Sequence, residues 1–156
     1  MQTSYDMYMP KAQAGTIYDT RFRQIDSFLA QGIVGIAKAV VRGTNRERQC
    51  VQAGTGAGQG ALIFGVSINA YVLEQTPAGL VQWADKMMVP VMRDGRLWVE
   101  TFDAVVAGAV ANFHLATGKW TDEAVATGIE AVPLLTPRFV TGTTGAGLAA
   151  IELHSI

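Results

Sequence analysis

Ionic side chains are scarce in this sequence. Twelve Lys and Arg and thirteen Asp and Glu make up 16% of its 156 residues, whereas an average globular protein has about 25%. Disordered chains are rich in charge and poor in apolar residues, but 49% of this chain is hydrophobic, so we expect a folded protein. The net charge of -1 counts against nucleic acid as a partner, because phosphate binding needs a basic excess. A surface with so few charges is typical of one that contacts other protein.

Cysteine is nearly absent, and a long apolar run is absent altogether. Cys50 stands alone, which excludes an internal disulfide framework and a Cys-rich zinc site. The longest uncharged stretch, 49–73, contains five glycines and several polar residues, whereas a membrane span needs about 20 predominantly apolar residues. The first ten residues lack the basic start and apolar run of a secretory signal. We therefore expect no membrane partner and synthesis in the cytoplasm.

Short apolar runs separated by glycine-containing turns dominate what is present. This rhythm predicts an all-β sandwich or barrel-like domain of eight to ten strands. Residues 1–20, with Tyr5, Tyr8 and Tyr18, are expected to form an extended arm ahead of a single β-rich domain over residues 21–156. At most one short helix is expected, over Thr20–Gln31, where apolar residues have helical spacing before a glycine. An irregular, partly paired segment is the alternative there.

Turn residues predict where the chain reverses. Met88–Met92 and Leu97–Phe102 flank Asp94-Gly95, a pair that tolerates the positive φ angles of a two-residue hairpin turn. A second hairpin is predicted over Phe113–Thr121, and the last strand over Leu148–His154.

A glycine-rich stretch, 54–61, partly fits a dinucleotide-binding fingerprint. That fingerprint requires a helix after the loop, whose N-terminus holds the pyrophosphate. The residues that follow, Leu62–Val66, favour a strand, and no acidic residue lies about 20 positions further on. A packed β-turn is therefore the preferred interpretation, and no cofactor is expected.

Other chemical groups are too dispersed to predict catalysis. His114 and His154 lie far apart from each other and from Cys50, without the spacing of zinc ligands. No serine has the Gly-x-Ser-x-Gly context, and the paired acids Glu100 and Asp103 lack a site that would hold both carboxylates. We therefore predict no enzyme activity, no catalytic residue and no metal site.

One basic cluster stands out, formed by Lys38, Arg42, Arg46 and Arg48 and offset by Glu47. It is interpreted either as a charged turn or as a docking patch for an acidic protein surface.

Five segments together resemble the structural cement, or head-decoration, proteins of tailed bacteriophages. These segments are Ala14–Asp19, Val89–Val99, Phe113–Thr121, Arg138–Thr141 and Gly147–Leu153. Their order and approximate spacing agree with the family over most of residues 10–155, while the longer polar and aromatic start, Met1–Met9, departs from it.

The resemblance implies a small β-domain that assembles as a homodimer or homotrimer on the outer surface of the mature head. There it would bridge major capsid protein subunits, with Tyr5, Tyr8, Ile17 and Tyr18 as anchors of the arm. The alternatives are another virion structural module, such as a tail or head-completion protein, and a small β-barrel ligand binder or enzyme.

Overall fold

The protein is all-β, as predicted from its sequence. The computed structural model describes residues 13–69 and 81–155. Within them the only helical element is a single 3-10 turn, η1 (Gly60–Leu62). The strands in chain order are β1 (Gln24–Ala30), β2 (Val34–Gly35), β3 (Ala39–Arg42), β4 (Gln49–Gln52), β5 (Gly65–Ser67), β6 (Gln82–Trp83), β7 (Met88–Glu100), β8 (Asn112–His114), β9 (Lys119–Thr121), β10 (Ile129–Glu130), β11 (Arg138–Phe139) and β12 (Leu148–Leu153).

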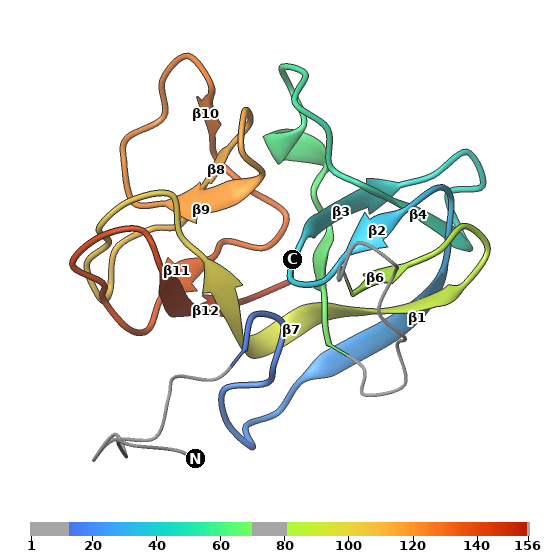
Figure 1. Cartoon of the computed structure of the whole chain (residues 1–156), viewed down its shortest axis with the longest axis horizontal. Helices are drawn as coiled ribbons and strands as arrows, with labels where there is room; N and C mark the ends of the chain where they lie inside the picture. Colours follow the sequence, from blue (N-terminus) through green and yellow to red (C-terminus); the bar gives the residue numbers. More distant parts are fainter. Residues whose placement is uncertain (1–12, 70–80, 156) are drawn as a thin grey trace, which may run out of the picture.

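Five strands close into a barrel, which we call the barrel half. They follow the order β1-β4-β3-β5-β7, and β7 pairs back with β1 to complete the ring (Figure 1, right). Because successive side chains of a strand point to opposite faces, Phe28, Val40, Cys50 and Val91 share one buried cluster. Ala39 and Val66 belong instead to a second cluster on the other face.

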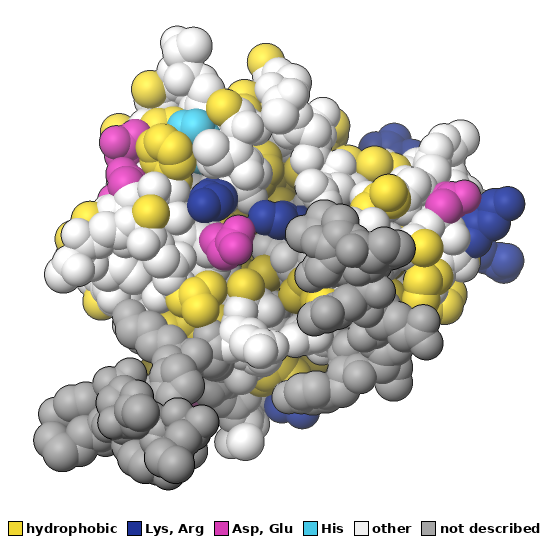
Figure 2. Space-filling model, viewed as in Figure 1, with side chains coloured by type: hydrophobic (Ala, Val, Ile, Leu, Met, Phe, Trp, Pro, Cys, Tyr) yellow, Lys and Arg dark blue, Asp and Glu magenta, His cyan; other side chains and the backbone are white. Residues whose placement is uncertain are grey.

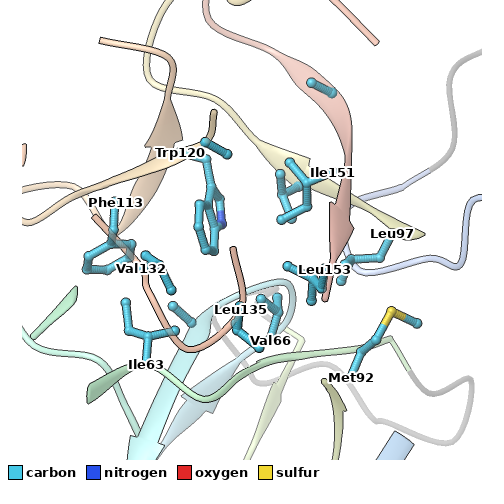
Figure 3. Close-up of a cluster of buried hydrophobic side chains, with 14 of the residues drawn as sticks. Ile63, Val66, Met92, Leu97, Phe113, Trp120, Val132, Leu135, Ile151 and Leu153 are labelled. Atoms are coloured by element: carbon cyan, nitrogen blue, oxygen red, sulfur yellow. The ribbon is translucent and has the colours of Figure 1, made fainter. Parts of the chain in front are cut away.

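The second part of the chain forms what we call the distal half (Figure 1, left). Here the last residues of β7 pair with β12, which pairs with β11, while β10, β8 and β9 form a separate three-stranded sheet. Its core includes Trp120, Phe113, Ile151 and Leu153, each at most 1% exposed (Figure 3). The rings of Trp120 and Phe113 meet edge to face, with centroids 5.9 Å apart. The core joins the halves, since Val66 of β5 lies in the same cluster.

The predicted hairpin at Asp94-Gly95 is wrong, because β7 runs straight through both residues. Gly95 has φ 123°, and a Cβ there would lie 2.9 Å from the Cβ of Arg23. Up to Asp94 the strand pairs with β1, and from Gly95 it pairs with β12. Glycine is thus required at position 95, where β7 changes partners and the backbone of Arg23 passes close by. An Asp-Gly pair in this setting looks the same in the sequence as an Asp-Gly turn.

Of the two interpretations of Thr20–Gln31, the helix is wrong and the paired segment is closer to the structure, because this segment contains β1. Its alternation buries Phe28 and Ala30, and its backbone pairs with β7 on one side and β4 on the other. Pairing on both sides outweighs weak helical spacing. By contrast, the hairpin of β8 and β9 is confirmed, with Gly118 at φ 65°, and so is the closing strand, β12.

Cys50 gives a first test of the barrel interior. Its side chain is fully buried, and this burial raises the pKa of the thiol to about 11. Alkylation requires the thiolate, so at pH 8 we expect iodoacetamide to label the folded protein at least about 100-fold more slowly than the protein unfolded in guanidinium. Mass spectrometry of timed samples measures both rates. Equal rates would show that the barrel does not enclose this residue.

Candidate interaction surface

The two histidines contact different residues and do not lie together. His114 stacks on Phe102 with ring centroids 4.1 Å apart, and its Nδ1 lies 3.0 Å from the Thr117 hydroxyl oxygen. His154 lies 3.6 Å from Glu152. Across residues 13–69 and 81–155, no three His, Cys, Asp or Glu side chains come together as a group that could hold a metal ion. None of the helical structure in those ranges is long and apolar enough to cross a bilayer.

The glycine-rich loop binds a carboxylate of the chain itself. The backbone N–H groups of Gly58 and Gly60 donate to the two oxygens of Glu130, each at 2.6 Å. A Cβ at position 60 would lie 2.5 Å from the carbonyl oxygen of Ala131, so glycine is needed for this close approach. The loop precedes η1 rather than a long helix, in agreement with the packed-turn interpretation. Glu130, on β10 of the distal half, therefore fastens the two halves together.

Sequence reasoning missed Glu130. It lies about 70 residues from its partners, and no local pattern marks it.

The segment 13–18 lies along β7. Gly15 donates to the carbonyl oxygen of Trp98 at 2.7 Å, and Tyr18 donates to that of Arg96 at 2.9 Å. Ile17 pairs with Leu97, and the Tyr18 ring packs against Trp98 with centroids 5.3 Å apart.

Two of the four predicted arm anchors can be placed. Ile17 and Tyr18 are 37% and 38% exposed, so both combine pairing to β7 with accessible apolar surface. Tyr5 and Tyr8 lie outside the described residues.

An ion-pair network fastens the segment that follows. Arg96 of β7 contacts Asp19 and Glu152, each at 3.2 Å, and Arg21 lies 3.5 Å from the same Glu152. The Arg96 side chain is only 17% exposed. The network therefore joins residues 19–21 to β7 and β12, and it uses cations that the sequence alone left unassigned.

The predicted basic cluster is divided by the fold. Lys38 pairs with Glu100 at 3.2 Å. The Arg42 guanidinium lies over the rings of Phe64 and Phe28, at 4.1 and 4.7 Å from their centroids, and burial lowers the pKa of this guanidinium.

The other two members, Arg46 and Arg48, are exposed on the turn between β3 and β4. They form no ion pair within the described part of the chain. Ile17 and Tyr18 lie beside β7 rather than on this turn, so the predicted contact residues that the structure places do not form one group.

Comparison with known proteins identifies a family and similar solved structures. The family model described as "Structural cement protein (E217 gp24/Pam3 gp6)" matches residues 1–154. A chain of the solved structure titled "The capsid of Myoviridae Phage XM1" is similar over 97% of this chain and 96% of that chain, with a TM-score of 0.72 and 16% sequence identity. At this identity, the second match shows a shared fold. No curated protein sequence matches the chain.

Proposed function

Because this chain belongs to the phage structural cement protein family, we propose that it binds the outer surface of the mature head and bridges neighbouring major capsid protein subunits. Membership of the family supports a structural role in the phage capsid. The observation that carries the proposal is the match of the family model to residues 1–154, which includes the N-terminal segment as well as the barrel.

Binding through several copies at once would give the protein a high overall affinity for the shell. A homodimer or homotrimer presents one docking site per copy, and linked sites can raise the overall affinity by about 10² to 10⁴ without stronger individual contacts. Such a protein needs neutral complementary surface and no active site, in agreement with the low charge of the sequence.

The direct test is binding to expanded heads assembled from the major capsid protein of the phage that encodes this chain. Purified protein should co-sediment with these heads and raise their resistance to heat, and quantitative mass spectrometry of the virion should find hundreds of copies. Tens of copies or fewer would indicate a head-completion or tail protein instead. Failure to co-sediment and to stabilise the heads would contradict the proposal.

We further propose that residues 1–12 act as an arm that extends from a fixed root. Residues 15–18 supply the root by pairing with β7. A chain of twelve residues spans at most about 40 Å, which is enough to contact a neighbouring subunit. Aromatic side chains contribute much of the energy at interfaces, so Tyr5 and Tyr8 are the proposed anchors of the arm.

Two truncations separate the arm from its root. Deletion of residues 1–12 should weaken head binding and leave the melting temperature unchanged. Deletion of residues 1–18 should also lower the melting temperature, because it removes the hydrogen bonds to Trp98 and Arg96. Co-sedimentation and differential scanning calorimetry measure the two effects. Full binding by the shorter deletion would show that the arm does not contact the shell.

A further inference from the structure

We propose that the end of the barrel at the β3–β4 turn docks an acidic segment of the shell protein. The inference rests on the proposed cement function and names the surface and the chemistry of one contact. It follows from three features: a turn fixed by hydrogen bonds, a groove that presents donors, and an uneven distribution of charge between the two halves.

The turn that carries Arg46 and Arg48 is held in one conformation. Asn45 is its centre: its carbonyl oxygen accepts from the Gln49 N–H at 2.9 Å, and its own N–H donates to the Gln49 side-chain oxygen at 2.9 Å. The Thr44 N–H donates to the side chain of Gln31, which follows β1, at 2.8 Å. A surface fixed before binding loses little conformational entropy when a partner docks. An exposed turn with this many hydrogen bonds is therefore suited to present two guanidinium groups.

A groove beside the turn presents hydrogen-bond donors. It has a volume of about 410 Å³, and its lining includes Arg42, Gln52 and Gln59 but no acidic residue. The Gln52 side-chain oxygen accepts from the Gly35 N–H at 2.9 Å, and that of Gln59 accepts from the Gly54 N–H at 3.2 Å.

These two bonds determine what the amides offer to a partner. In both glutamines the side-chain oxygen is used, and the Nε2 group donates to no other described residue. The groove therefore offers amide donors and no carboxylate, which suits a partner rich in carboxylate and carbonyl oxygens. The Arg42 guanidinium is not one of these donors, because it lies over the rings of Phe28 and Phe64.

The charge distribution favours the same end of the molecule. In the barrel half, residues 24–69 and 81–94 contain six basic and four acidic residues, whereas residues 95–155 contain three basic and six acidic residues. Figure 2 shows Lys and Arg side chains gathered along the edge of the barrel half, while hydrophobic side chains are scattered over the visible face.

A protein is the partner that this site fits. Two free guanidinium groups next to Glu47 offer too few cations to follow a phosphate backbone, which takes many contacts. Complementary charge guides the approach and the orientation of a protein partner, so the barrel end is expected to face the shell and the distal half to face outward.

Matched charge reversals test the inference. The test variant is Arg46→Glu with Arg48→Glu, and the control is Arg23→Glu with Lys119→Glu, which changes the net charge by the same amount away from the turn. Affinity for expanded, cement-free heads is measured by co-sedimentation over a series of NaCl concentrations, and a melting temperature close to that of the wild type shows that each variant is folded. We expect the test variant to bind at least about 100-fold more weakly at low salt, and the control to bind within about threefold of the wild type.

Each outcome has a definite meaning. Selective loss in the test variant supports the docking site, and wild-type binding that weakens with rising salt supports its ionic character. If the wild type binds and both variants bind equally well, or lose affinity equally, the inference is overturned while the cement function stands. If the wild type does not bind the heads at all, the proposed function fails, and the inference fails with it.

Discussion

The Trp120→Ala variant is expected to lose about 4 kcal/mol of unfolding free energy. The indole is fully buried, meets Phe113 edge to face, and lies in the core that joins the two halves (Figure 3). The cavity left by this substitution would open in a fully buried cluster, and such cavities collapse only in part, which adds to the loss. A domain of this size is typically stable by about 5–15 kcal/mol. The variant should therefore be partly unfolded at moderate temperature, as urea denaturation followed by circular dichroism would show.

Trp120→Phe is the matched control. It keeps an aromatic ring beside Phe113 and removes the indole N–H, which has no hydrogen-bond partner among the described residues. A buried donor without a partner is destabilising by about 1–3 kcal/mol, so its removal should offset much of the lost volume. We expect the phenylalanine variant to retain most of the wild-type stability. Equal losses for alanine and phenylalanine would contradict the packing described for this core.

Glu130→Ala is expected to lower the free energy of unfolding by about 3 kcal/mol. A hydrogen bond to a charged group contributes about 1.5–3 kcal/mol, and this substitution removes two, from the N–H groups of Gly58 and Gly60. Both amides would then exchange with solvent faster, because the loop would no longer be fastened to β10. Urea denaturation measures the first effect, and amide hydrogen exchange followed by NMR measures the second.

Two further variants distinguish this contact from a general effect of charge. Glu130→Gln keeps one oxygen acceptor but turns an NH₂ group toward the second N–H, so its loss should be intermediate. Glu123→Ala removes an exposed carboxylate and should change stability by less than about 0.5 kcal/mol. If exchange at Gly58 and Gly60 is unchanged in Glu130→Ala, the carboxylate does not hold the loop.

Features that depend on neighbouring residues were predictable from the sequence. The all-β class, the hairpin at Gly118 and the closing strand β12 follow from alternation and turn residues within a few positions. The Asp94-Gly95 hairpin failed because the need for glycine at position 95 comes from Arg23, 72 positions earlier in the chain.

The same distinction applies to the candidate site. Arg46 and Arg48 were predicted as part of a basic cluster and are exposed together on one turn. Lys38 is not available to a partner, because it forms an ion pair with Glu100, 62 positions away. Arg42 is not available either, because its guanidinium lies over the ring of Phe64. Neither distant partner is indicated by the residues around 38–48, so the sequence could propose the patch but not select its free members.

Closure of the barrel by the pairing of β1 with β7 affects how this part of the molecule can contact another protein. An open sheet edge exposes N–H and C=O groups that can pair with the edge of another molecule, which is a common route to aggregation. In the ring of β1, β4, β3, β5 and β7, every strand has a neighbour on both sides, and residues 15–18 cover the remaining edge of β7. A second molecule that meets the barrel ring can therefore touch it through side chains without adding a strand to that ring.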